Sequence, residues 1–412
     1  MAEINFFQGQ SDLFEFMTNN DDESLRDEQI KEIRKRILEF FNIKNIHFLF
    51  GSGTSCNAIP NMRGLFSEVK KVIDSSSKNS KREFNEILDR IDKKENLEDV
   101  LGILYSQSIY LNGYERHKRM RIICNALIKK IERTIFKMIN IDFNAPEAKE
   151  VLEIYQKFYS KLALRNKDLS RLNIFTTNND LFNETALDSL NIHYINGFGG
   201  GINKFFNPAL FNYTFSKRMD TSIEKFEPVE NMLYLYKIHG SVNWIEDDSN
   251  SNTFFKIREV SCPKKLDETE KNILIYPTPT KQNKSLGSPY VELFREFQKK
   301  LLDPHSVLFV IGYSFSDEHV NNIIYQTLAT NSTMNLVILN DVEHAGISKI
   351  NDNRIFRIWE TQKQEEWAAG KTPIHFFKNI VNELLPNIDA YKNQDKTLKE
   401  FIEFYNENLV KT

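Results

Sequence analysis

The sequence predicts an α/β protein built on a Rossmann-like parallel sheet, with an inserted all-helical module and a short helical C-terminal tail. Several uninterrupted apolar runs are rich in β-branched and aromatic residues, as in strands that are buried on both faces of a parallel sheet. The first such run, residues 46–50, breaks into Gly51-Ser52-Gly53-Thr54-Ser55. Between residues 66 and 170, helical periodicity replaces the strand pattern.

Composition sets the broad class of the protein. The chain has 412 residues, of which 41% are hydrophobic and 27% charged, as in ordinary soluble globular proteins. It has no apolar run long enough to span a membrane and no secretory leader, so we expect a cytoplasmic protein without a membrane partner. Cys56, Cys124 and Cys262 are scattered singly, which argues against a disulfide framework or a zinc site. A net charge of −3 gives no general attraction to DNA.

The periodicities divide the chain into four parts. We expect an N-terminal helix and the first strand in residues 1–65, after an irregular lead-in over 1–23. The helical module follows in 66–170, the remainder of the Rossmann-like domain in 171–362, and the helical tail in 363–412. The expected strands are 46–50, 172–175, 192–195, 234–238, 254–257, 273–276, 307–311, 336–339 and 355–359. The expected helices are 24–41, five within the module that end with 148–164, then 289–302, 317–329, 374–385 and 396–409.

The glycine turn after the first strand is a candidate phosphate-binding element. Gly51 and Gly53 allow a tight turn and a close approach of the backbone to a phosphate. The hydroxyls of Thr54 and Ser55 can donate hydrogen bonds to an anion or cap a following helix.

Polar residues follow four more of the expected strands. Ligands of open α/β sheets bind at the carboxyl ends of the strands. Taken alone, each of these segments has a plain explanation as a turn, a helix cap or a surface histidine. Because they meet at one sheet edge together with the glycine turn, they favour a shared site. The segments are Thr177-Asn178-Asn179-Asp180, His239-Gly240-Ser241, Gly312-Tyr313-Ser314 and Asn340-Asp341.

In order and spacing, these elements resemble the sirtuins over residues 46 to about 345. The family's glycine turn, its Ile-Pro-Asp-Phe-Arg-like element, its Thr-Gln-Asn-x-Asp element, its catalytic His-Gly, its Gly-Thr-Ser and its late Ile-Asn all have counterparts. In that order they are Gly51-Ser52-Gly53-Thr54-Ser55, Ala58-Ile59-Pro60-Asn61-Met62-Arg63, Thr176-Thr177-Asn178-Asn179-Asp180, His239-Gly240, Gly312-Tyr313-Ser314 and Leu339-Asn340.

The sequence departs from the deacylating sirtuins in two features. Deacylating sirtuins carry a four-cysteine zinc module after the His-Gly, whereas only Cys262 lies near it here, and Asn61 stands where the family has Asp. The strings Lys-Ile-His-Gly-Ser-Val-Asn-Trp and Gly-Tyr-Ser-Phe-Ser-Asp-Glu-His look closer to sirtuin-like domains of bacterial antiphage defence systems, which hydrolyse NAD. In size the chain is similar to the sirtuin-like subunit that assembles with a hexameric HerA-type ATPase.

The resemblance implies a role for each matching residue. His239 would be the proton acceptor, Asn178 would orient a water, and Asp180 would orient its neighbours. NAD would be bound as a substrate, without zinc and without any other metal. The residues implied in binding NAD are Gly51, Gly53, Thr54, Ser55, Asn61, Arg63, Gly312, Ser314 and Asn340.

The implied function is therefore NAD hydrolysis in abortive infection, by a homo-oligomer gated by the ATPase. Three alternatives stay open at this point. The chain could be an NAD-dependent protein deacylase, or a sensor that binds NAD or ADP-ribose without turnover. It could also be a DNA-processing subunit, because the expected helix 114–138 is strongly basic, with Arg119, Arg121 and Lys130 among its cations.

Overall fold

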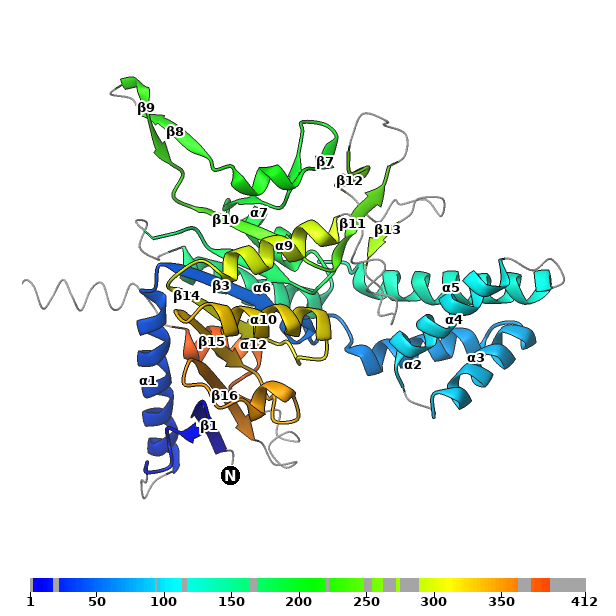
Figure 1. Cartoon of the computed structure of the whole chain (residues 1–412), viewed down its shortest axis with the longest axis horizontal. Coiled ribbons are helices and arrows are strands. Elements are labelled where there is room, and N and C mark those ends of the chain that lie inside the picture. Colours follow the sequence, from blue (N-terminus) through cyan, green and yellow to red (C-terminus); the bar gives the residue numbers. More distant parts are fainter. Residues whose placement is uncertain are drawn as a thin grey trace, which may run out of the picture.

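The protein is described here by a computed structural model, which shows a mixed α/β fold (Figure 1). The structure describes residues 3–17, 22–92, 95–112, 117–163, 169–219, 222–247, 254–261, 272–274, 289–361 and 372–385.

A mainly parallel sheet forms the centre of the fold and confirms the predicted fold class. Within the described residues it has nine strands in the order β2-β1-β16-β15-β14-β3-β4-β10-β5, and all strands from β16 to β5 run parallel. The bounds are β1 Glu3–Gln8, β2 Ser11–Asp12, β3 Asn45–Phe50, β4 Asn173–Thr176, β5 His193–Ile195, β10 Met232–Lys237, β14 Ser306–Ile311, β15 Met334–Leu339 and β16 Ile355–Thr361.

Helices cover both faces of this sheet. Side chains alternate between the faces of a strand, so Phe48 and Phe50 of β3 join one core while Leu49 joins the other. The first core is completed by α1 (Asp22–Phe41), α6 (Pro146–Leu162), α7 (Phe182–Ser189) and the C-terminal segment. The second is completed by α9 (Tyr290–Leu301), α10 (Glu318–Thr330) and a smaller sheet.

The first strand of the chain corrects one expectation. Residues 1–23 were expected as an irregular lead-in, but β1 pairs antiparallel with β16 at the edge of the main sheet. Ile4 and Phe6 are buried there, whereas Glu3 is exposed and Asn5 is only partly buried. This short alternation is the pattern of a half-buried strand, which is a weaker signal than a fully apolar run.

Antiparallel strands lie beside the main sheet, and most of them were not expected from the sequence. The expected strand 273–276 overlaps one of them, Asn272–Leu274. A five-stranded sheet has the order β13-β11-β12-β7-β6, and β8 with β9 forms a separate hairpin that projects at the upper left in Figure 1. The expected strand 254–257 begins only at Ile257. The bounds are β6 Phe198–Gly199, β7 Lys204–Phe206, β8 Ser216–Met219, β9 Ser222–Pro228, β11 Gly240–Glu246, β12 Ile257–Glu259 and β13 Asn272–Leu274.

In the described part of the chain, four helices form the inserted module, which projects to the right in Figure 1. The helices α2 to α5 share a core of their own, which also includes Val242 of β11. In contrast, α6, which we expected in the same module, packs on the main sheet through Tyr155, Phe158 and Tyr159. The bounds are α2 Met62–Asp74, α3 Lys78–Arg90, α4 Leu97–Leu111 and α5 Lys118–Ile139.

The C-terminal segment lies against the main sheet. A short helix, α12 (Phe377–Asn379), continues into a π-helical turn, Ile380–Leu384, where we expected one helix over 374–385. Phe377 packs against Phe50, Tyr155 and Phe158. The expected helix 396–409 lies outside the described residues. No helix in the described part of the chain is long and apolar enough to cross a membrane.

Candidate active site

A cavity of about 270 Å³ opens at the carboxyl ends of β3, β4, β10 and β14. It combines polar groups from the sheet edge with an apolar wall from the helical module. The residues that line it are Ser52, Ser55, Ile59, Pro60, Asn61, Met62, Leu65, Ile135, Ile139, Thr177, Asn178, Asn179, Asp180, His239, Gly312, Tyr313, Ser314, Ser316 and Asp317.

The two glycines of the first turn pack against a second turn rather than line the cavity. A Cβ added at Gly51 would lie 2.5 Å from the carbonyl oxygen of Gly312, and one added at Gly53 would lie 2.7 Å from the Gly312 Cα. Gly312 itself has a φ of +64°, in the left-handed region that favours glycine. These glycines therefore let the turns after β3 and β14 touch.

A short 3₁₀ turn, Ser52–Ser55, follows Gly51. The sequence suggested that Thr54 or Ser55 could cap a following helix, but α2 begins only at Met62. A four-residue turn has too few aligned peptide units to act as a helix dipole. The hydroxyl of Thr54, a proposed phosphate donor, is buried and donates to the Gly51 carbonyl oxygen at 2.9 Å.

Asn178 holds this turn in place. Its Nδ2 donates to Thr54 Oγ1 at 3.0 Å and to Ser55 Oγ at 3.2 Å. The hydroxyl of Tyr155 on α6 adds a 2.7 Å bond to Thr54 Oγ1. Asn178 lines the cavity, yet its amide nitrogen is directed into the protein, so any contact of this residue with water or substrate falls to its Oδ1.

Asp180 is buried in the same network. Its Oδ2 accepts a 2.8 Å bond from Ser55 Oγ, and its Oδ1 accepts one from the Phe182 backbone N–H at 3.1 Å. Burial raises the pKa of Asp180, and the charge of Lys237 opposes this rise. One carboxyl oxygen of Asp180 therefore holds the turn after β3, and the other holds the start of α7.

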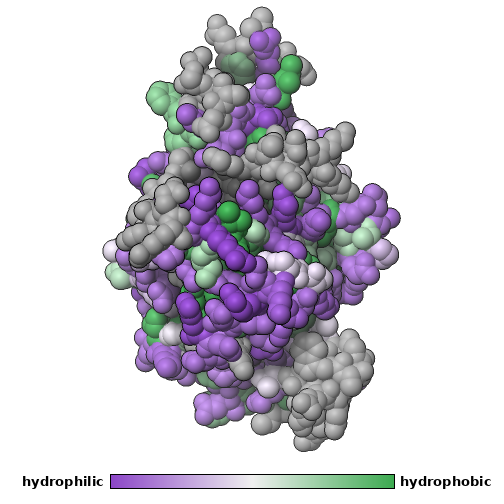
Figure 2. Space-filling view, turned by 90° about the vertical axis from the view of Figure 1, so that its right-hand side faces the viewer, coloured by the Kyte–Doolittle hydropathy of each residue, from purple (hydrophilic) through white to green (hydrophobic). Residues whose placement is uncertain are grey.

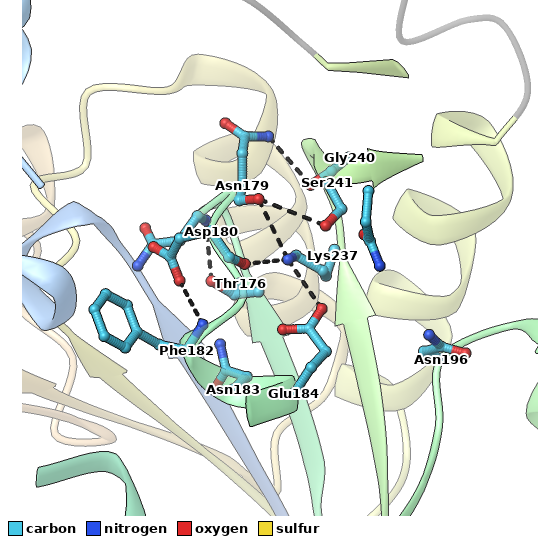
Figure 3. Close-up of polar contacts among 12 residues, drawn as sticks. Thr176, Asn179, Asp180, Phe182, Asn183, Glu184, Asn196, Lys237, Gly240 and Ser241 are labelled. Carbon is cyan, nitrogen blue, oxygen red and sulfur yellow. Dashed lines mark hydrogen bonds and ion pairs between the residues drawn. The ribbon is translucent and has the colours of Figure 1, made fainter. Parts of the chain in front are cut away.

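Lys237 is the second buried group that fixes the loop after β4 (Figure 3). With a side chain only 1% exposed, it forms an ion pair with Glu184 Oε1 at 3.0 Å and donates hydrogen bonds to the carbonyl oxygens of Asn179 and Asp180. Asn179 Nδ2 in turn donates to the carbonyl oxygen of His239 at 2.7 Å. One loop thus connects the glycine turn with the histidine segment.

His239 lies between the end of β10 and the start of β11. Its Nε2 is 3.2 Å from Asp317 Oδ2, and the two side chains are 12% and 9% exposed. The ring of Phe294 on α9 packs edge-on against the imidazole, with centroids 6.3 Å apart. The histidine is therefore held at the cavity wall by a carboxylate and an aromatic ring.

The remaining predicted binding residues are placed differently. Asn61 lines the cavity, but its Oδ1 also accepts the Gly64 N–H at 3.0 Å as the N-cap of α2. Arg63 is 84% exposed, pairs with Glu95 at 3.6 Å and does not line the cavity. Ser314 lines it, whereas Asn340 binds the Tyr313 carbonyl oxygen at 3.0 Å and supports the second turn.

Lys237, Glu184, Asp317 and Tyr155 were not singled out from the sequence, although two of them left a local signal. Lys237 is an interruption in an otherwise apolar strand, and Asp317 is an N-cap signal before α10. Nothing in the sequence pattern indicates that the aromatic face of α6 reaches the glycine turn. The contribution of Ile135 and Ile139 on α5 to the cavity was equally hidden.

The basic side chains of α5 lie away from this cavity. Lys129, Lys130, Arg133 and Lys137 line a separate groove of about 690 Å³ beside Glu68 of α2. Figure 2 looks onto the end of the molecule where the module projects, and most of the coloured surface there is hydrophilic. Across the described ranges, no group of three or more His, Cys, Asp or Glu side chains is arranged to hold a metal ion. Cys262 lies outside those ranges.

Comparisons with solved structures give similarities at low identity. A Sir2 homologue in complex with NAD is 12% identical, with 87% of this chain and 94% of that chain covered and a TM-score of 0.42. A mutant Sir2 homologue in complex with ADP-ribose is 11% identical, with coverages of 87% and 98% and a TM-score of 0.41. No curated protein matches this chain. Residues 172–363, which contain Asn178, His239 and Asp317, match the family model described as a SIR2-like domain.

Proposed function

We propose that this chain is an NAD glycohydrolase, which hydrolyses NAD to nicotinamide, ADP-ribose and a proton. One observation carries the proposal. His239 and Asn178 line a single cavity at the carboxyl edge of the parallel sheet, beside an apolar wall of Met62, Leu65 and Ile135. Ligands of open α/β sheets bind at this edge, and an apolar wall suits the nicotinamide ring. The SIR2-like match over residues 172–363 supports the choice of NAD as substrate.

In this proposal His239 acts as the general base. Water attacks the anomeric carbon of the nicotinamide ribose, and the bond to nicotinamide breaks with its electron pair moving onto the leaving ring. His239 accepts the proton of the water, since imidazole is the side chain best suited to proton transfer near neutral pH. Asn178 positions the water through Oδ1, the polar atom not engaged with Thr54 and Ser55.

The binding residues follow from the cavity lining. Ser55, Asn61, Gly312 and Ser314 lie at its wall and are proposed to contact NAD. Gly51, Gly53, Thr54 and Asn340 are proposed to act indirectly, because they fix the two turns that touch each other. Arg63, which is exposed and paired with Glu95, is proposed to contact NAD only if its side chain turns toward the cavity.

The cellular role that we propose is NAD depletion in antiphage defence, gated by assembly with a HerA-type ATPase and accompanied by homo-oligomer formation. The resemblance of Lys-Ile-His-Gly-Ser-Val-Asn-Trp and Gly-Tyr-Ser-Phe-Ser-Asp-Glu-His to sirtuin-like defence domains supports this role. Light scattering of the chain, alone and with such an ATPase, tests the assembly. A monomer under both conditions would contradict it.

The decisive experiment measures nicotinamide release from NAD by the purified chain, alone and with the ATPase partner. His239→Ala should abolish release, whereas the matched control His344→Ala, at an exposed loop residue outside the cavity, should leave it unchanged. Equal turnover by His239→Ala and the parent would contradict the assignment.

The same assay separates the two alternative uses of NAD. A deacylase would release nicotinamide only when an acylated peptide is present, whereas the proposed hydrolase needs NAD and water alone. A sensor would bind NAD in isothermal titration without releasing nicotinamide. Release without peptide is the outcome we expect.

A second candidate function, DNA binding, rests on the groove beside α5. Its four cations lie at positions 129, 130, 133 and 137, which share one face of a helix. Clustered cations of this kind can follow a phosphate backbone, and such binding weakens steeply with salt. Fluorescence anisotropy with duplex DNA at two salt concentrations tests it, with Lys129→Glu/Lys137→Glu as the disrupting variant. Binding that is unchanged in this variant would exclude the groove.

A further inference from the structure

Asp317 occupies a position that the sequence resemblance did not assign. Its Oδ1 accepts the backbone N–H groups of His319 at 2.9 Å and Val320 at 3.3 Å, as the N-cap of α10. Its Oδ2 is the atom 3.2 Å from His239 Nε2. The same carboxylate therefore caps a thirteen-residue helix and contacts the proposed catalytic base.

Hydrogen bonds and a left-handed residue define the loop that carries Asp317. Phe315 is buried and has a φ of +57°, a left-handed conformation that bulky residues rarely adopt. Asn321 Nδ2 donates to the Phe315 carbonyl oxygen at 2.8 Å, and the Tyr313 hydroxyl lies 3.1 Å from the Asp317 carbonyl oxygen. The fold thus maintains an unfavourable backbone conformation next to the carboxylate that faces His239.

The charge state of the Asp317 carboxylate determines which nitrogen of the His239 imidazole carries the proton. An ionised carboxylate only accepts hydrogen bonds, and the two N–H groups at the start of α10 favour the ionised form. The shared proton therefore belongs to His239 Nε2. In the neutral imidazole this leaves Nδ1 as the nitrogen with the free lone pair.

We propose that Asp317 is the positioning residue for His239. It fixes the Nε2–H tautomer, so that Nδ1 accepts the proton of the attacking water, and its negative charge then stabilises the imidazolium. This inference rests on the proposed hydrolysis of NAD for its catalytic part, but the tautomer is a property of the protein without substrate.

The test compares the parent protein with Asp317→Asn. Asparagine is as good an N-cap as aspartate, so α10 is preserved, but its NH₂ group would face Nε2 and favour the opposite tautomer. Histidine ¹⁵N NMR without substrate should show Nε2–H at His239 in the parent and Nδ1–H in the variant, with His239→Ala to assign the signals. With NAD, kcat should fall by about 10³-fold or more and KM should stay nearly constant.

Two further variants make the experiment specific. Glu318→Gln removes an exposed acid from the same helical turn and should change neither the tautomer nor kcat. Asp317→Ser keeps the cap but loses the contact with Nε2, so kcat should fall as in Asp317→Asn. An unchanged tautomer in Asp317→Asn, or an unchanged kcat in both Asp317 variants, would overturn the proposal. A parent protein without NAD cleavage would contradict the proposed function, whereas the tautomer measurement would still test the contact.

Discussion

The side-chain amide of Asn178 lies 3.0 Å from the Thr54 hydroxyl and 3.2 Å from that of Ser55. An amide at the end of β4 thus supports the turn at the end of β3. Asn178, for which the sequence resemblance implied a role in orienting water, therefore also stabilises the turn next to the cavity.

Replacing Asn178 by alanine should therefore affect both stability and turnover. The buried hydroxyls of Thr54 and Ser55 would lose a donor, and we expect the free energy of unfolding in urea to fall by about 1–3 kcal/mol. The folded Asn178→Ala variant should also release no nicotinamide from NAD. An unchanged urea midpoint would show that these contacts add nothing to stability.

Lys237 and Glu184 should behave as a coupled pair in unfolding experiments. Lys237→Met alone leaves the Glu184 carboxylate buried without its counter-ion, which should destabilise the protein by about 3–5 kcal/mol. The double variant Lys237→Met/Glu184→Gln should recover part of this loss because residue 184 then carries no charge that needs a counter-ion. If the two changes were simply additive in urea unfolding, the ion pair would not be the source of the effect.

Gly51 should not tolerate a side chain, unlike an exposed glycine elsewhere. In Gly51→Ala the new methyl group would lie 2.5 Å from the Gly312 carbonyl oxygen, so the two turns must separate. We expect this separation to lower the free energy of unfolding by about 1–3 kcal/mol. A Cβ added at Gly201 would have no other atom within 4 Å, and Gly201→Ala should stay within about 0.5 kcal/mol of the parent. Thermal unfolding of the two variants provides the comparison, and equal effects would contradict the proposed close packing.

His375 should make stability fall as the pH drops below neutrality. Burial lowers the pKa of His375 from 6.5 to about 4, and its Nδ1 accepts the Glu360 N–H at 3.2 Å, which requires the neutral ring. Between about pH 6.5 and 4 the unfolded chain binds a proton that the folded chain does not, so folding is weakened by about 2 kcal/mol at pH 5.

The matched variant for this effect is His375→Asn, whose Oδ1 can accept the same N–H group without titrating. Urea unfolding at pH 7 and pH 5 should show a larger loss of stability in the parent than in the variant. Parallel losses in the two proteins would rule out His375 as the cause.

The main sheet and the shared sheet edge could be predicted because parallel strands have strong local signals. Fully apolar runs such as 307–311 and 336–339 identify buried strands, and the polar residues after them fall at one edge by topology. By contrast, the edge strand β1 and the small antiparallel sheet have short or mixed patterns. Pairing with distant partners decides their structure, and a single sequence does not show those partners.

The candidate site was predictable only in part, for the same reason. His239, Asn178 and Ser314 could be placed at the cavity because each closely follows a strand. The contacts that orient them come from side chains remote in sequence, such as Tyr155 to Thr54, 101 residues apart. Local spacing also does not reveal that the hydroxyl of Thr54 faces the interior.

The apolar wall of the cavity belongs to a different packing unit from its polar wall. Leu65 and Ile135 are buried in the core shared by α2 to α5, whereas His239 and Asn178 are fixed by bonds within and beside the main sheet. The two walls of the cavity therefore depend mainly on different sets of contacts. We expect a substitution in the core of the module to change the shape of the apolar wall while the hydrogen bonds of Asn178 and the contact between His239 and Asp317 persist.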